Sequence, residues 1–214
     1  MPAVLVWKNV RIQMQSNNIV PKTITSITKA NPAVVTCSAH GFTTGAYVFL
    51  DVRGMRQLSD RVARVGSTTT DTFQLEGIDS SLFDDFVSGS AGLVSFGTSI
   101  TTATNLTASG GEFDFIDTTT IHDNQRSQVP GLPSAISFSM ENLWDASDPG
   151  LLAMKYASDN QLKRAFKIQF GDSGKLILFA GYVGCTMLPG GNALDKVTTQ
   201  SVITINGLPT YYAS

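Results

Sequence analysis

The side chains that could carry out chemistry are few, and the spacing between them is wide. The two histidines, His40 and His122, stand at no zinc-ligand spacing from a cysteine or from each other. His40 precedes a glycine and is typical of a turn, whereas His122 is typical of the end of a strand. Cys37 and Cys185 fall in different candidate strands, which favours two buried free thiols over a disulfide and is consistent with a reducing cytoplasm.

The carboxylates suggest no site either. Asp84-Asp85 lacks a nearby partner for acid–base work. The run Asp145–Asp148 superficially suggests a calcium loop, but Pro149 and the short span favour helix capping. The chain contains neither a Gly-x-x-x-x-Gly-Lys phosphate loop nor a Gly-x-Ser-x-Gly elbow. We therefore expect no enzyme, no cofactor and no metal.

Composition points to a β-rich protein of one large or two small domains. The chain has 214 residues, of which 15% are charged, and it is rich in Thr, Ser, Gly and Val. A formal net charge of −2 and a pI near 5.6 argue against a general nucleic-acid binder, which normally carries a basic surplus. We recognise no signal peptide and no apolar run of the roughly 18 residues that a membrane helix needs, so no membrane partner is expected.

Alternating residues predict the strands that must position any site. Residues 4–15 form the first strand, with Val4, Val6, Val10, Ile12 and Met14 on one face. Further strands are expected at 100–106, 165–170, 175–187 and 196–207, followed by a short tail at 208–212. Residues 175–187 are apolar on both faces, as in a central strand. One helix of about ten residues begins at Asp148-Pro149, with Leu152 and Tyr156 spaced to pack on a sheet.

Between the first strand and Gly97 the sequence pattern changes to that of short strands separated by turns. They are expected at 23–28, 33–38, 47–52, 61–65 and 72–75, and the Gly/Ser run at 88–92 closes the unit. Strands at such short intervals suggest a small barrel or sandwich.

We interpret the stretch from Phe113 to Trp144 as the one around which the rest of the chain is organised. Phe113 and Phe115 share one face of a first run, and Ile136, Phe138 and Met140 share one face of a second. Both runs are expected to be half-buried strands. The polar loop between them is longer than a hairpin needs, which favours a functional loop, although an ordinary surface loop is an equal alternative.

Two resemblances are carried by motifs. Ala30–Thr36, Ala39–Gly45 and Thr72–Gly77 resemble the small β-domain of phage virion proteins that is named after the first catalytic-cysteine half-domain of ubiquitin-activating enzymes. Cys37 has no nearby base, so no catalytic cysteine is transferred. The resemblance implies a surface module over residues 23–96.

A second set of segments follows in a defined order: Phe113–Thr119, Arg126 with Val129–Leu132, Ser137–Met140, Asp148–Gly150, Phe166–Phe170, Phe179–Val183 and Val202–Pro209. Taken in this order, residues 97–214 resemble the major tail tube proteins of long-tailed, siphovirus-type phages. The resemblance implies a two-sheet antiparallel β-sandwich with one flanking helix, made of residues 1–22 and 97–214, with residues 23–96 inserted on its outer surface.

The same resemblance implies a virion protein that is assembled in the host cytoplasm. Its copies would form hexameric rings, stacked into a tube that encloses the tape-measure protein, meets tail terminator and tip proteins, and conducts DNA without binding it specifically. The long loop would reach a neighbouring subunit or ring through Asp123, Asn124, Gln125, Arg126, Val129, Pro130 and Gly131.

A conduit for DNA should have a polar, neutral or acidic wall, because a basic lining would retain phosphates. The polar faces of the two central runs carry no Lys or Arg, and we expect them to line the lumen. Their residues are Glu112, Asp114, Thr118, Ser137, Ser139 and Glu141. The alternative is the ordinary solvent face of a sheet.

Two rival functions remain open at this point. A tube or terminator protein of a contractile tail or secretion machine would share the fold, although a contractile sheath would leave little room for an outer module. A carbohydrate-binding or adhesin sandwich would need an exposed aromatic platform, for which only Trp7 and Tyr211-Tyr212 are candidates.

Overall fold

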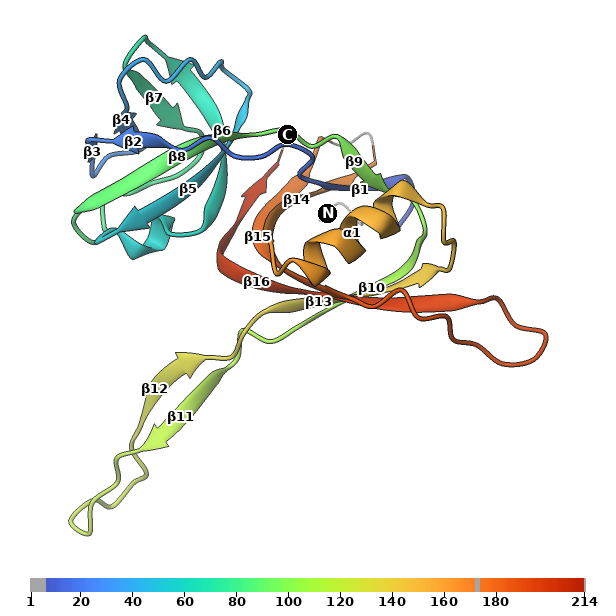
Figure 1. Ribbon diagram of the computed structural model, residues 1–214. Helices are drawn as coiled ribbons and strands as arrows, with labels where there is room; N and C mark the ends of the chain where they lie inside the picture. The colour runs from blue at the N-terminus through green and yellow to red at the C-terminus, as the bar shows by residue number, and fades with distance from the viewer. Residues whose placement is uncertain (1–6, 172–173, 214) are drawn as a thin grey trace.

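Antiparallel β-structure dominates the computed structural model, which describes residues 7–171 and 174–213 (Figure 1). A seven-stranded sheet, the curled sheet, has the order β10-β13-β16-β15-β14-β1-β9. A second seven-stranded sheet, the insert sheet, has the order β2-β8-β5-β6-β7-β4-β3, and β11 pairs with β12 alone. The expected mostly-β class with one α-helix is confirmed. The predicted sandwich takes the form of one continuous sheet that curls, with α1 across its open side (Figure 1).

The strand bounds are as follows. The curled sheet contains β1 (Val10–Met14), β9 (Thr98–Ile100), β10 (Ala103–Ser109), β13 (Ser137–Leu143), β14 (Lys163–Phe170), β15 (Leu176–Cys185) and β16 (Thr198–Tyr212). The insert sheet contains β2 (Lys22–Ile24), β3 (Ser26–Ile27), β4 (Val34–Thr36), β5 (Tyr47–Arg53), β6 (Arg61–Thr68), β7 (Thr72–Leu75) and β8 (Ser88–Val94). A 3₁₀ turn, η1 (Arg56–Leu58), follows β5. The remaining pair is β11 (Phe113–Asp117) and β12 (Gln128–Pro133).

Helix α1 (Pro149–Asp159) begins where the sequence predicts. Asp148 Oδ1 accepts a hydrogen bond from the Leu151 backbone N–H at 2.8 Å, and Pro149 occupies the first helical turn. The packing face differs from the expectation. Leu152 and Tyr156 are exposed, and the helix buries Leu151, Met154 and Ala157 instead. A spacing of three residues satisfies the helical period as well as four does, so the sequence alone left the two faces undecided.

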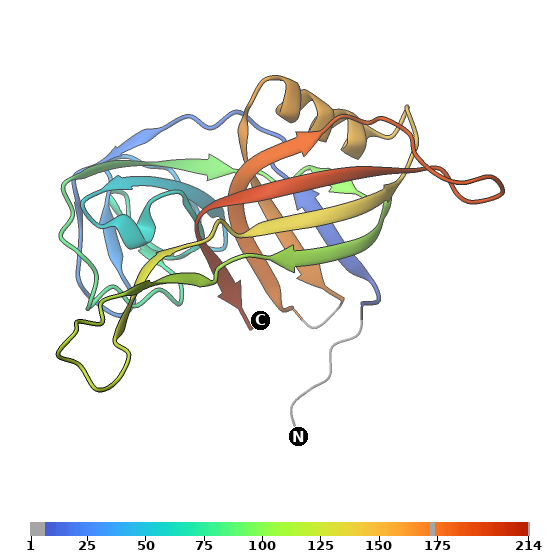
Figure 2. The same ribbon diagram turned by 90° about the horizontal axis from the view of Figure 1, so that it is seen from below.

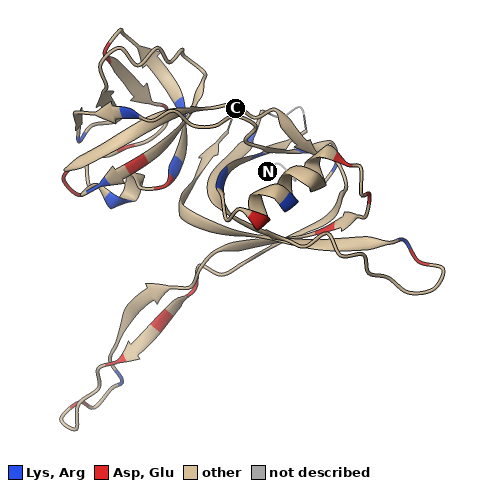
Figure 3. Ribbon diagram, in the orientation of Figure 1, with Lys and Arg blue, Asp and Glu red and all other residues tan. Residues whose placement is uncertain are grey.

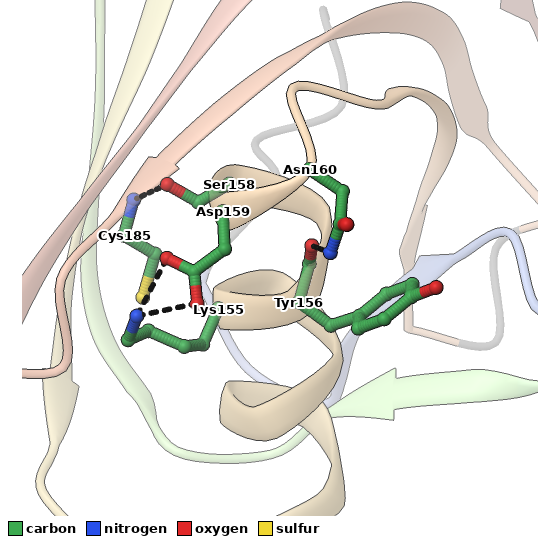
Figure 4. A network of polar contacts seen from close by, with 6 residues as sticks. All are labelled: Lys155, Tyr156, Ser158, Asp159, Asn160 and Cys185. Carbon is green, nitrogen blue, oxygen red and sulfur yellow. Dashed lines mark hydrogen bonds and ion pairs between the residues drawn. The ribbon is translucent and has the colours of Figure 1, made fainter.

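The end of α1 is tied to the curled sheet (Figure 4). The Cys185 backbone N–H donates to Ser158 Oγ at 3.1 Å, and Asn160 Nδ2 donates to the Tyr156 carbonyl at 2.8 Å. Lys155 and Asp159 form an ion pair on the exposed side of the same turn. The contact between Cys185 and Ser158 holds the end of the helix against β15.

The apolar core lies inside the curl. Phe166 of β14 stacks on Phe179 of β15 with ring centroids 5.5 Å apart, and Met140 of β13 and Met154 of α1 belong to the same cluster. The insert sheet has a core of its own, which includes Phe73 and Leu50. The buried ring of His40 lies in the insert sheet's part of the chain, and its Nδ1 accepts a hydrogen bond from the Phe42 N–H at 2.9 Å.

Several expected boundaries are wrong. Residues 88–92 are part of strand β8 and do not simply close the unit, and the expected tail at 208–212 continues strand β16. The single strand expected at 100–106 divides into β9 and β10. Within the first predicted strand, Val4 and Val6 lie outside the described residues, and the described part is strand only over β1. The domain boundaries at 22/23 and 96/97 stay a prediction.

Candidate tube-forming surfaces

The most exposed element is a projecting hairpin, which we call the arm (residues 110–136, with strands β11 and β12). Figure 1 shows it reaching away from both seven-stranded sheets. At its root Gly110 has φ +87°, and a Cβ there would collide with the Ala135 backbone, so the crossing of the two chain segments requires glycine. At its tip Asp123 Oδ2 accepts the Thr120 N–H at 2.8 Å, which orders the turn.

The arm corrects two expectations from the sequence. The two central runs do not pair with each other: β11 pairs with β12, whereas β13 pairs with β10 and β16. The predicted contact loop is therefore half strand, because Val129, Pro130 and Gly131 belong to β12. Asp123, Asn124, Gln125 and Arg126 form the exposed tip, and His122 lies in the turn there and not at a strand end.

The first central run is not half-buried, because every residue of β11 is exposed. The same holds for most of β12, so the arm presents an apolar surface to solvent. Its exposed apolar side chains are Phe113, Phe115, Ile116, Ile121, Val129 and Leu132. An isolated soluble domain rarely exposes so many apolar side chains on one element, and such surfaces usually mark a protein interface.

A second surface, the polar face, covers the outer side of β10, β13 and the first half of β16 (Figure 2). Cross-strand partners point to the same side of a sheet. Ser139 lies between Thr107 and Val202, and Glu141 between Asn105 and Gln200. The remaining members are Ser109, Ser137 and Thr204. Phe138 and Met140 point the other way into the core, so this half of the expected alternation is confirmed.

The six residues expected to share a lumen wall fall on two different surfaces. Ser137, Ser139 and Glu141 lie on the polar face, whereas Glu112, Asp114 and Thr118 lie on the arm. Periodicity located the polar sides of both runs but could not show that they belong to different sheets. Glu141 also faces Lys196 at 3.9 Å, so the polar face is close to neutral (Figure 3).

A third surface joins the insert sheet to the outer side of β14, β15 and the end of β16. Leu178, Ala180 and Val62 are buried there in a cluster separate from the two cores. Lys163 Nζ contacts Asp60 at 2.8 Å, and Arg61 Nε donates to Thr210 Oγ1 at 2.9 Å.

The C-terminal strand supplies further polar contacts to the same joint. The Arg64 backbone N–H donates to the Tyr212 hydroxyl at 2.7 Å. Sequence reasoning missed this joint, because residues 208–212 were taken for a tail. The apolar residues on both faces of β15 were the sequence signal that a second layer covers this strand.

The two cysteines are buried, and Asp84 and Asp85 are in ion pairs. Cys37 and Cys185 are buried and free, as expected, and burial raises the pKa of both thiols. Asp84 pairs with Arg56 at 2.9 Å and Asp85 with Lys29 at 2.5 Å, which lowers the pKa of Asp85.

Over residues 7–171 and 174–213, no three His, Cys, Asp or Glu side chains gather in a metal-binding group. In the same described ranges, no helix is both long enough and apolar enough to span a membrane.

Comparison with known proteins gives one family match and two similar solved structures. A family described as phage tail tube protein, TTP, matches residues 53–214, which begins within β5 and so includes part of the insert sheet. Two similar solved structures are the virion of a native gene transfer agent particle and the C6-symmetric tail of an empty gene transfer agent particle. Each is 14% identical to this chain and has a TM-score of 0.41. The match covers 56% of this chain in both cases, and 89% of the first structure's chain and 87% of the second's. No curated protein sequence matches. Because the family match covers well over half of it, this chain belongs to the phage tail tube proteins and is a structural protein of the virion tail.

Proposed function

We propose that six copies of the chain join into a ring, that rings stack into a hollow tube, and that the polar face lines its lumen. The observation that carries this proposal is the position of the polar face beside a free sheet edge, because β10 pairs on only one side among the described strands. An exposed strand edge is a template for another chain, and closing a ring of subunits removes it. The ring number follows the family resemblance.

The chemistry of the polar face suits a conduit. Hydroxyl and amide side chains dominate it, and its one carboxylate, Glu141, faces Lys196. DNA passing such a wall would release few counterions and so would not be held. The same wall would contact the tape-measure protein before ejection, and the tube ends would meet terminator and tip proteins.

Residues 23–96 form the outer module in this proposal. The insert sheet covers β14, β15 and the end of β16, and it leaves the polar face uncovered. A bulky module on the outer wall favours a non-contractile tail, because a contractile sheath would compete for the same space. Assembly of the tube would take place in the host cytoplasm.

Electron microscopy of the purified full-length protein tests tube formation, and cysteine accessibility tests the lumen. Ser139→Cys places a thiol on the polar face, and Leu82→Cys places one on a fully exposed loop of the insert. The reagent is a maleimide on a carrier protein too large for the bore. We expect both thiols to react in single copies and only Leu82→Cys to react in tubes. Equal labelling of the two variants in tubes would place the polar face outside.

A further inference from the structure

The dipeptide Asn206-Gly207 is the only place in the chain where a glycine follows an asparagine. This order is the most reactive context for an asparagine side chain. A glycine has no Cβ, so its main-chain nitrogen can approach the side-chain amide of the residue before it. The dipeptide lies within strand β16, between the part that pairs with β13 and the part that contacts the insert.

The hydrogen-bonded ladders of the curled sheet end or pause at this dipeptide. On one side, the pairing of β16 with β13 ends at Thr204. On the other, the pairing with β15 stops after Asn206 and resumes only at Thr210. Residues 207–209 therefore form a bulge opposite a single residue of β15. The backbone leaves both ladders directly after Asn206, so rotation about its last main-chain bond does not break a regular strand pair.

Both reacting groups are accessible to solvent. Gly207 is exposed and Asn206 is half-buried. Within residues 7–171 and 174–213, the side-chain amide of Asn206 makes no hydrogen bond that would hold it away from the main chain.

The fold itself requires the glycine of this dipeptide. Gly207 has φ +73°, and a Cβ there would lie 2.7 Å from the Asp60 carbonyl oxygen. A larger residue, which would slow the reaction of the preceding asparagine, would strain the bend. The reactive order is therefore a consequence of the way in which β16 turns toward the insert.

The reaction needs only water. The Gly207 nitrogen loses its proton to a solvent base and attacks the side-chain carbonyl carbon of Asn206, and the side-chain nitrogen leaves as ammonia. The product is a succinimide ring that includes the main chain. Water then opens this ring at either carbonyl, which gives an aspartate or an isoaspartate. In total one water is consumed and one ammonia is released, and nothing is oxidised or reduced.

We propose that Asn206 is a site of spontaneous deamidation, and that its isoaspartate product loosens the joint between the two seven-stranded sheets. Beyond the bulge, Thr210 Oγ1 accepts a hydrogen bond from Arg61 Nε at 2.9 Å, and the Tyr212 hydroxyl accepts one from the Arg64 backbone N–H at 2.7 Å. An isoaspartate adds one carbon to the main chain just before these residues and so displaces both acceptors. The proposal concerns single copies and does not rest on tube formation.

Peptide mapping by mass spectrometry tests the modification on the full-length protein. Single copies are incubated at mildly alkaline pH, folded in buffer or unfolded in urea, and conversion of residue 206 is followed over time. We expect the folded protein to react at most about tenfold more slowly than the unfolded chain, an opening cost of about 1.4 kcal/mol. Asn192, an exposed asparagine followed by an alanine, is the internal control and should keep its amide. Conversion in urea without conversion in the folded protein would overturn the proposal, because the fold would then protect the site.

Matched variants test the effect on the joint. The isoaspartate form, isolated by chromatography, should unfold at a lower urea concentration than the unmodified protein. Asn206→Asp carries the same charge without the extra main-chain carbon and should lose less stability. Asn206→Gln closes the corresponding ring far more slowly, so its urea midpoint should not change during the same incubation. Equal midpoints for the isoaspartate form and the unmodified protein would refute the loosening, and so would an equal loss in Asn206→Gln.

Discussion

Removal of one hydroxyl, by Tyr212→Phe, should loosen the insert sheet from the curled sheet. The Tyr212 hydroxyl accepts the Arg64 backbone N–H at 2.7 Å, and the side chain is only 8% exposed. The phenylalanine ring fills the same space and keeps its contact with the Arg64 guanidinium, 4.6 Å from the ring centre. The substitution therefore removes the hydroxyl that accepts this N–H and changes little else.

The expected cost is the loss of this hydrogen bond, about 0.5–1.5 kcal/mol of unfolding free energy. For a chain of this length, each kcal/mol lowers the melting temperature by about 2–4 °C. Tyr211→Phe is the matched control, because Tyr211 is the adjacent residue of the same strand and is largely exposed. Its change should stay within about 0.5 kcal/mol.

The dependence of stability on alkaline pH gives a second test of the Tyr212 side chain. Burial is the main cause that raises the pKa of Tyr212 above its usual value of 10.0. The folded state keeps the phenol neutral. The contribution of Tyr212 to the free energy of unfolding is therefore complete below the pKa of the unfolded state, and it is lost as the pH rises through the pKa of the folded state. Wild-type stability should therefore fall from about pH 10 upward, and Tyr212→Phe should show a shallower fall.

Urea unfolding of single copies, followed by tryptophan fluorescence and circular dichroism at pH 7 and above pH 10, measures both effects. Unchanged stability of Tyr212→Phe at pH 7 would refute the claim that this hydrogen bond secures the joint. An equal alkaline loss in wild type and Tyr212→Phe would refute the pH argument alone.

Three further predictions follow from other contacts. Asp148→Ala removes the N-cap of α1 and should cost about 1 kcal/mol in urea unfolding; an unchanged midpoint would show that the cap is dispensable. Gly207→Ala should cost about 1–3 kcal/mol, because Gly207 has φ +73° and a Cβ would lie 2.7 Å from the Asp60 carbonyl oxygen. Gly184→Ala meets only ordinary contacts and should cost less, so equal melting temperatures would contradict this reasoning. Deletion of residues 23–96 should cause aggregation, measured by gel filtration, because it exposes Leu178 to solvent. Leu178→Thr in the deleted chain should restore tubes. Soluble tubes from the simple deletion would show that the joint is not needed.

The sequence predicted elements whose cause is local. The Asp148-Pro149 helix start and the alternation of Phe138 and Met140 are confirmed because capping and side-chain periodicity act within a few residues. The turn glycines likewise located most of the short strands of the insert sheet.

What the sequence could not predict depends on pairing at long range. Alternation in β11 could not reveal that Phe113 and Phe115 face solvent, because an intermolecular surface and a core have the same pattern. The buried joint between the sheets was missed for a related reason. Leu178 looks like any core residue until the insert sheet is placed on it.

The proposed site was therefore only partly foreseen. The contact role of the arm and the polar side of β13 were predicted from motif order and alternation, and no comparison tests either. The groove lined by β1, β9 and β10 was not foreseen, because strands far apart in the sequence form it together.

Strand β16 has a mechanical consequence. Its first half pairs with β13 beneath the polar face, and its last residues, beyond the bend at Gly207, contact the insert at Arg61 and Arg64. In the proposed tube, one unbroken backbone would cross from the conduit wall to the outer module. A pull on the module along this strand would load the β15–β16 hydrogen bonds side by side in shear, not one after another. The module is thereby anchored against drag without a covalent cross-link.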